Sequence, residues 1–135
     1  MPRVLLAVRW ILEHAHAAPD CHARGMIRAF DATTHPVTHE PLPPEKARSE
    51  GVTTGLAQVV TDAGLEAGVW EHSVGSSTDS FGDEVFVVLA GHGVVRDQHG
   101  GEIVLAPGVV GVLHEGDVTT WEITEPLRKV WIVRG

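Results

Sequence analysis

The sequence is short of several residue types, and each shortage excludes a class of protein. It holds one cysteine, Cys21, in 135 residues, which excludes an internal disulfide and predicts a reducing cytoplasm as its compartment. Lysine and arginine number 10 against 18 aspartates and glutamates, so the net charge is −8 and neither nucleic acid nor an anionic membrane is the expected partner. No apolar run approaches the ~20 residues of a membrane-spanning helix. What remains is one ordinary globular domain.

Residues 1–25 differ in charge from the rest of the chain. They carry three arginines against two acidic residues, a net +1, which leaves −9 on the other 110 residues. Val4–Leu12 is apolar apart from Arg9 and has helical spacing, so it predicts a short N-terminal helix. A secretory signal is a second interpretation, although Arg9 interrupts its apolar part. A third is that translation starts at Met26 and that residues 1–25 are an upstream extension. We assign this segment no role in the chemistry.

Residues 26–50 are predicted to form an extended arm. The prolines remove backbone donors too often for a regular helix or a central strand. They are Pro36, Pro41, Pro43 and Pro44. Such an arm can add a strand to the sheet edge of a partner, which is one way for the chain to form a dimer.

Residues 51–135 have the pattern of an all-β domain. Short runs of β-branched and apolar residues alternate with Gly- and Asp-rich turns every 8 to 12 residues. The predicted strands are Thr53–Thr61, Leu65–Ser73, Glu84–Leu89, Val94–Arg96, Glu102–Leu105, Val109–Leu113, Val118–Thr124 and Leu127–Val133. Residues 75–82 are predicted to be a polar loop, and Pro126 is expected to end a strand. The pattern predicts a sandwich or a barrel, of which the jelly roll is one form.

Two segments resemble the two sequence motifs of a cupin. In the first, Glu84 and Gly91 are separated by six residues, as are the last two positions of the first motif. In the second, Gly108 leads to His114 at the position of the motif's proline, and Thr119 stands at the position of its histidine. The resemblance implies a double-stranded β-helix, that is, a jelly-roll barrel.

The finer resemblance is to small single-domain cupins similar to ureidoglycine aminohydrolase and to an accessory protein of ethanolamine utilisation. It covers roughly residues 40–133. The segments that carry it are Gly68-Val-Trp-Glu71, Asp83-Glu-Val85, Leu89-Ala-Gly91, Thr119-Thr-Trp-Glu-Ile123 and Arg128-Lys-Val130. By this analogy the protein forms a homodimer.

The metal ligands of many cupins are largely missing here. The resemblance implies two histidines one residue apart and a later one. The residues at those positions are Ser77 and Asp79, or Thr78 and Ser80, and then Thr119. Transition-metal ions prefer imidazole, so we expect no tightly bound metal and no other cofactor. Two alternatives stay open for His72 and His114: weak metal binding together with Asp79, or plain surface positions on a strand and in a turn.

Glu84 is the candidate catalytic residue. Strand alternation places Glu84 and Phe86 on one face, and Thr119 and Trp121 on one face of a later strand. The resemblance implies that both faces line the barrel, so we take Trp70, Phe86, Thr119 and Trp121 as candidate ligand-binding residues. A carboxylate among aromatic rings is a candidate general acid or base.

Each of these assignments has a structural alternative. Glu84 can bond to a backbone N–H or pair with Arg128 or Lys129, and the tryptophans can be plain core. Glu71 and Glu122 alternate away from the tryptophans and are expected to face solvent.

Three functions are compatible with this pattern. The first is a cupin that binds a small polar metabolite and acts as a metal-independent lyase, hydrolase or isomerase. The second is a non-catalytic ligand-binding or accessory cupin. The third is a metal-dependent enzyme similar to ureidoglycine aminohydrolase. The sequence does not identify the ligand.

Overall fold

The computed structural model describes residues 27–134, and the predictions made for residues 1–25 lie outside this part of the chain. Within it there are strands and turns but no helix, so the all-β prediction is confirmed there. The strands are β1 (His39–Pro41), β2 (Thr53–Asp62), β3 (Leu65–His72), β4 (Gly75–Ser80), β5 (Glu84–Arg96), β6 (Glu102–Leu105), β7 (Val110–Leu113) and β8 (Val118–Arg134).

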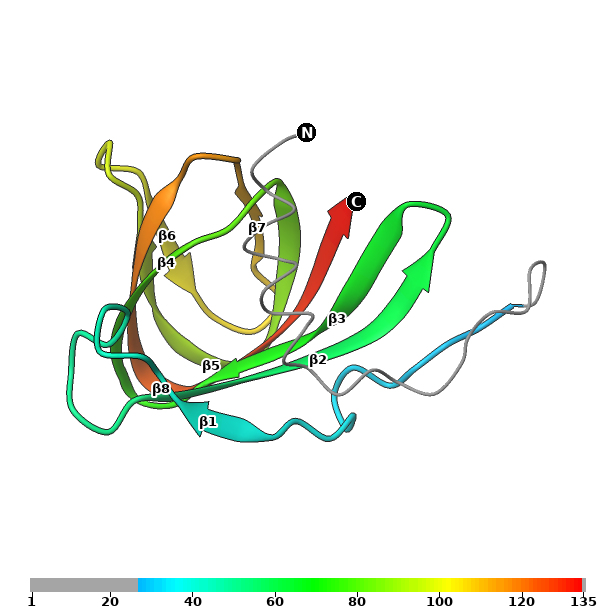
Figure 1. Cartoon of the computed structure of the whole chain (residues 1–135), viewed down its shortest axis with the longest axis horizontal. Helices are drawn as coiled ribbons and strands as arrows, with labels where there is room; N and C mark the ends of the chain where they lie inside the picture. The colour runs from blue at the N-terminus through cyan, green and yellow to red at the C-terminus, as the bar shows by residue number, and fades with distance from the viewer. Residues whose placement is uncertain (1–26, 135) are drawn as a thin grey trace.

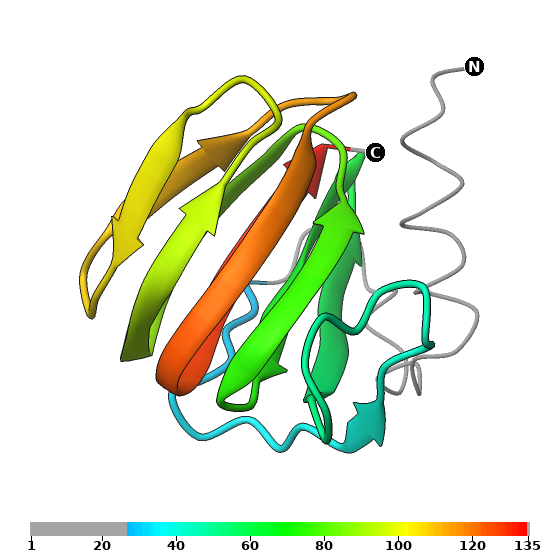
Figure 2. The same ribbon diagram turned by 90° about the vertical axis from the view of Figure 1, so that its left-hand side faces the viewer.

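All strand pairs are antiparallel, and the two longest strands organise the sheet. The hydrogen-bonded order is β1-β2-β3-β8-β5-β6, while β4 pairs with one half of β8 and β7 with one half of β5. In Figure 1, β5 and β8 curl round one side of the molecule and the β2–β3 hairpin extends to the other. Figure 2 shows the strands lying side by side across the curled part. The concave side of this sheet holds the core.

The longest strand, β8, continues through Pro126, so the prediction that this proline ends a strand is wrong. The reason lies in the neighbouring strand β5, whose register with β8 shifts between Val88 and Gly93. Gly91 lies in that irregular stretch at φ +94°, and a Cβ there would come within 2.2 Å of the Pro126 carbonyl oxygen. A proline is tolerated at a bulge because no ladder partner needs its missing N–H. The same irregularity lets β5 run unbroken where two strands were predicted.

Residues 75–80 form strand β4, so the prediction of a polar loop there is also wrong. The segment lacks the β-branched apolar residues that mark a strand, and its structure comes from its neighbours. Along one edge it pairs with β8, with Ser77 opposite Trp121. Along the other, the Thr78 N–H donates to the Lys46 carbonyl at 2.8 Å and the Arg48 N–H to the Ser76 carbonyl at 2.9 Å.

The segment from residue 27 to residue 50 is mostly irregular and includes β1, which pairs with β2 of the same chain. Arg128 on β8 fixes its course. The Arg128 guanidinium donates to the carbonyl of Ala32 at 2.8 Å and to that of His35 at 2.5 Å, and it pairs with Glu71. Whether the arm reaches a partner stays a prediction.

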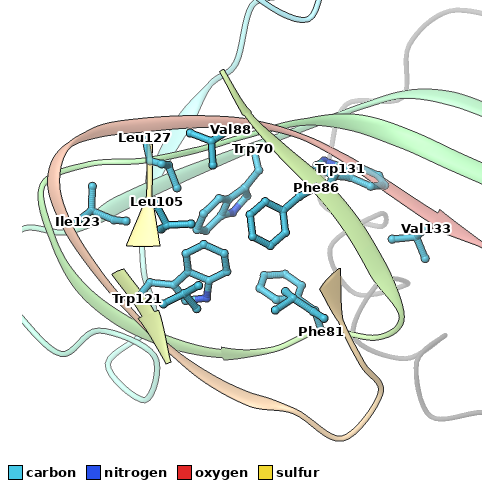
Figure 3. Close-up of a cluster of buried hydrophobic side chains, with 12 residues drawn as sticks. Trp70, Phe81, Phe86, Val88, Leu105, Trp121, Ile123, Leu127, Trp131 and Val133 are labelled. Atoms are coloured by element: carbon cyan, nitrogen blue, oxygen red, sulfur yellow. The ribbon is translucent and has the colours of Figure 1, made fainter. Parts of the chain in front are cut away.

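The core lies inside the curl and is rich in aromatic rings. Figure 3 shows Trp70, Trp121 and Phe86, from three strands, and Phe81, from the loop between β4 and β5, pointing toward one another. The Trp70 and Trp121 ring centroids are 5.1 Å apart, and those of Phe86 and Trp121 are 5.8 Å apart. At such separations, tilted rings contribute about 0.5–1.5 kcal/mol per pair beyond their burial. The rest of the buried cluster is aliphatic apart from Trp131, and it includes Val88, Leu105, Leu113, Ile123, Leu127 and Val133.

Candidate active site

A buried ion pair lies among these rings. The Lys129 ammonium donates to Glu84 Oε2 at 2.7 Å, and the two side chains are only 1% and 5% exposed. Glu84 begins β5 and Lys129 lies in the second half of β8. Their strands are hydrogen-bonded neighbours, with Val133 opposite Glu84 and Val88 opposite Lys129. The lysine side chain therefore runs along the sheet to reach the carboxylate.

Four aromatic rings surround the ammonium. Lys129 Nζ lies 4.8 Å from the Trp70 ring centroid, 5.1 Å from Phe81, 4.6 Å from Phe86 and 4.6 Å from Trp121. A cation over a desolvated ring face gains about 2 kcal/mol or more. Rings from three elements and one loop thus stabilise a charge that burial disfavours, and Glu84 supplies the counter-charge.

The two oxygens of Glu84 differ in their surroundings. Oε2 accepts from Lys129. Oε1 has no hydrogen-bond partner in residues 27–134. It is not fully buried, however, because the only fully buried side-chain nitrogen or oxygen without a partner in that range is Trp131 Nε1. Oε1 therefore keeps some contact with solvent, in line with the 5% exposure of the side chain. This oxygen is the part of the ion pair that is in contact with solvent.

His72 lies on the same inner side and is fully buried. Its Nδ1 is 2.5 Å from the Ser73 carbonyl oxygen, so Nδ1 carries the proton and donates. Its Nε2 then accepts from the Ser77 hydroxyl at 2.8 Å. Burial lowers the pKa of His72, with a further contribution from the positive charge of Lys129. The imidazole is therefore neutral near pH 7, and the expectation that His72 lies on a strand surface is wrong.

Thr119 and Trp121 are linked to each other inside the sheet. The Trp121 indole N–H donates to Thr119 Oγ1 at 2.9 Å, and the Thr119 hydroxyl donates to the Asp79 carbonyl at 3.0 Å. The Asp79 carboxylate pairs with Lys46 at 3.1 Å. These contacts hold the Trp121 ring in place against Lys129.

The residues at the positions where the cupin motifs have metal ligands do not fit a transition metal. Glu84 is held by an ammonium, Ser77 by His72, Thr119 by a backbone carbonyl and Asp79 by Lys46. A metal cation beside Glu84 would also be repelled by the Lys129 charge. In residues 27–134, no three His, Cys, Asp or Glu side chains are grouped so as to hold a metal ion.

The structure brings most of the predicted site residues together. Lys129 Nζ contacts Glu84 and the rings of Trp70, Phe86 and Trp121. Thr119 joins this group because it accepts a hydrogen bond from the Trp121 indole N–H. Whether they bind a ligand stays a prediction. Glu122 faces solvent as expected, and His114 is 73% exposed in its turn. Glu71 was expected to face solvent too, but it is only 26% exposed because it pairs with Arg128.

Sequence reasoning missed the central position of Lys129, which it named only as one possible partner of Glu84. The signal is present in the sequence. Leu127, Trp131 and Val133 alternate onto the inner face of β8, and Lys129 has the same parity. A lysine in phase with buried residues on a strand is rare and needs a counter-ion.

In the described part of the chain, no helix is long and apolar enough to span a membrane.

Comparison with solved structures gives the same fold. A putative ethanolamine utilization protein Q from Salmonella typhimurium matches at TM-score 0.54 and 21% identity, over 60% of this chain and 68% of the other. The EutQ protein of Clostridium difficile matches at 0.57 and 14%, over 62% and 69%. Ectoine synthase from P. lautus matches at 0.55 and 13%, over 60% and 63%. At these identities the similarity shows the fold alone.

A search of the curated proteins finds no significant match. A family model, by contrast, matches residues 60–131, which is just over half of the chain and includes the ion pair and its rings. The chain therefore belongs to the family of EutQ-like cupin domains.

Proposed function

We propose that this cupin binds a small polar metabolite against Glu84 and transfers a proton to or from it without a metal ion. The observation that supports the proposal is the buried Glu84–Lys129 pair. Buried charges are costly unless paired, and a carboxylate with one oxygen left for a substrate is a candidate general acid or base. The reaction class is that of a lyase, hydrolase or isomerase.

In this proposal the two residues have separate roles. Lys129 holds the carboxylate of Glu84 in one orientation through Oε2. Glu84 Oε1 takes a proton from the substrate and returns it later, as a general base and then a general acid. The rings of Trp70, Phe86 and Trp121 exclude water around the pair, which strengthens every electrostatic interaction there.

A ligand screen followed by one substitution tests the proposal. We expect a compound from a panel of ureides, amino acids and short carboxylic acids to raise the unfolding temperature of the wild-type protein. The ureides in the panel represent the finer resemblance to ureidoglycine aminohydrolase. Turnover of any compound that binds is then followed by proton NMR.

Glu84→Gln keeps the shape of the side chain and removes its basicity, so we expect turnover to fall by 100-fold or more, in the ~10²–10⁴-fold range of general acid–base catalysis. Glu115→Gln, at an exposed glutamate in the turn before β8, is the matched control and should not change turnover. Unchanged turnover in Glu84→Gln would refute the catalytic assignment. About one equivalent of manganese, iron or zinc in purified active protein would refute the metal-independent part.

A second candidate function is a non-catalytic ligand-binding or accessory cupin. The observation that favours it is that Lys129 is 1% exposed and already satisfies one oxygen of Glu84. Binding without turnover of any compound in the panel would select this alternative.

We also propose that the protein is a cytoplasmic homodimer. Light scattering of the full chain at tens of micromolar tests the dimer, and a monomeric mass would refute it. The single Cys21 supports a reducing compartment.

A further inference from the structure

We infer that the ligand of this site carries a carboxylate or carbonyl oxygen, which accepts hydrogen bonds from the Trp131 indole N–H and the Lys129 ammonium. The inference rests on the proposed function and narrows its ligand to one chemical class. It assigns a ligand-binding role to Trp131, a residue of β8.

The first observation is an unpaired donor inside the core. Trp131 is 3% exposed, and its Nε1 is the one fully buried side-chain nitrogen or oxygen without a hydrogen-bond partner in residues 27–134. Buried polar groups in folded proteins are almost always paired, so each exception needs an explanation. A ligand oxygen at this position would supply the missing partner.

The second observation is the location of that donor. Trp131 lies opposite Phe86 in the β5–β8 register, one inward position from Lys129 on its own strand and diagonally across from Glu84. Figure 3 shows its ring beside that of Phe86. The ring atom Cζ2, which lies next to the N–H on the same edge of the indole, lies over Gly68, where a Cβ would be 2.8 Å from it. The glycine leaves room for the indole on the inner face, where β3 runs beside β8 and Gly68 is opposite Trp131.

The third observation is a surplus of donors at the site. Lys129 has three N–H groups, and within residues 27–134 Glu84 is the only oxygen or nitrogen acceptor that any of them contacts. The others face aromatic rings, which are weaker acceptors than an oxygen. By contrast, Trp121, Thr119, Ser77 and His72 are all paired. Apart from Glu84 Oε1, which could accept a further hydrogen bond, the groups of this site that still need a partner are therefore donors.

The same inventory argues against a cationic ligand, although a ring of aromatic side chains with a carboxylate is otherwise suited to one. The centre of the four rings is already occupied by the Lys129 ammonium. A second cation beside it would be repelled in a medium of low dielectric constant. An anionic or polarised oxygen is attracted by the same charge.

The test uses the full-length protein with ¹⁵N-labelled tryptophan, whose indole N–H groups give separate NMR signals. The chain has four tryptophans, and Trp131→Phe assigns the signal of interest by its loss. Short carboxylates and keto acids are titrated against it, with primary and quaternary ammonium compounds as the opposite charge class. The Trp121 signal is the internal reference, because its N–H already donates to Thr119.

We expect carboxylates or keto acids to move the Trp131 signal downfield and to leave the Trp121 signal nearly unchanged. We also expect Trp131→Phe to weaken their binding about tenfold, the effect of one hydrogen bond. Trp121→Phe is not a suitable control because its ring contacts Lys129, so exposed Val112→Thr on β7 serves instead and should bind normally.

The outcomes separate this inference from the proposed function. The inference fails, and the proposed function stands, if only ammonium compounds bind. It also fails if a carboxylate binds but neither moves the Trp131 signal nor binds more weakly to Trp131→Phe. Under that result a trapped water is the partner of the indole. If no compound of either class or of the wider panel binds, both fail.

Discussion

Replacing Lys129 by methionine removes the buried positive charge and keeps most of the side-chain volume. The change leaves the carboxyl group of Glu84 buried, with its side chain 5% exposed, and without its counter-ion. Losing one partner of a buried ion pair costs about 3–5 kcal/mol, because the remaining charge stays desolvated. Four cation–π contacts are lost as well, so we expect a cost near the upper end, about 5 kcal/mol.

The cost in stability becomes diagnostic when Lys129 and Glu84 are replaced singly and together, in a double-mutant cycle. Glu84→Gln alone leaves the lysine charged, but four ring faces still stabilise it, so we expect a smaller cost of about 2–3 kcal/mol. In Lys129→Met with Glu84→Gln, no buried charge remains. Replacing both members of a buried pair is often neutral, so the double variant should be more stable than Lys129→Met alone by about 2 kcal/mol or more.

Urea unfolding followed by tryptophan fluorescence measures these free energies. The matched control is Lys46→Met, which removes a partly exposed lysine from its pair with Asp79. An exposed pair contributes about 1 kcal/mol or less, so this variant should lose little. Two results would refute the buried ion pair. One is a cost below about 1 kcal/mol for Lys129→Met, and the other is a double variant that is no more stable than Lys129→Met.

Two further predictions concern other parts of the core. Burial lowers the pKa of His72 below its ordinary 6.5, so in acid the unfolded chain binds a proton that the folded chain does not. The free energy of unfolding should therefore fall as the pH drops below 6.5. The contribution of this residue is up to about 1.4 kcal/mol per pH unit. Urea unfolding of wild type and His72→Gln at pH 7.5 and 5.5 checks this, and an equal pH dependence in both proteins would contradict it. At Gly111 a Cβ would lie 2.2 Å from Phe86 Cζ, so Gly111→Ala should cost about 1–3 kcal/mol by overpacking. Thermal unfolding beside the exposed control Val110→Ala checks this, and equal unfolding temperatures for the two variants would mean that Phe86 can move aside.

Much of the fold could be predicted because strand patterns are local. The alternation of Glu84 and Phe86, and of Thr119 and Trp121, fixes which side chains share a face, whatever surrounds the strand. The turn at residues 97–101 and the positions of β2, β3 and β6 follow from Gly- and Asp-rich breaks. The predictions failed where neighbours override local preference. Polar β4 is a strand because both of its edges find partners, and Pro126 sits within β8 because the adjacent strand is irregular there.

By itself the sequence determined the class of fold, the side chains that share a face with Glu84 and the shortage of imidazole ligands, because residue type and strand parity are written along the chain. That the Glu84 face points inward was implied by the resemblance to cupins. Only the tertiary structure decided that Lys129 reaches Glu84 through four rings, that His72 is buried against Ser77, and that Trp131 keeps an unpaired donor. His72 and Ser77 lie on different strands, and Glu84 and Lys129 are 45 positions apart on separate strands. Contacts of that range are set by sheet register and curvature, which no local pattern encodes.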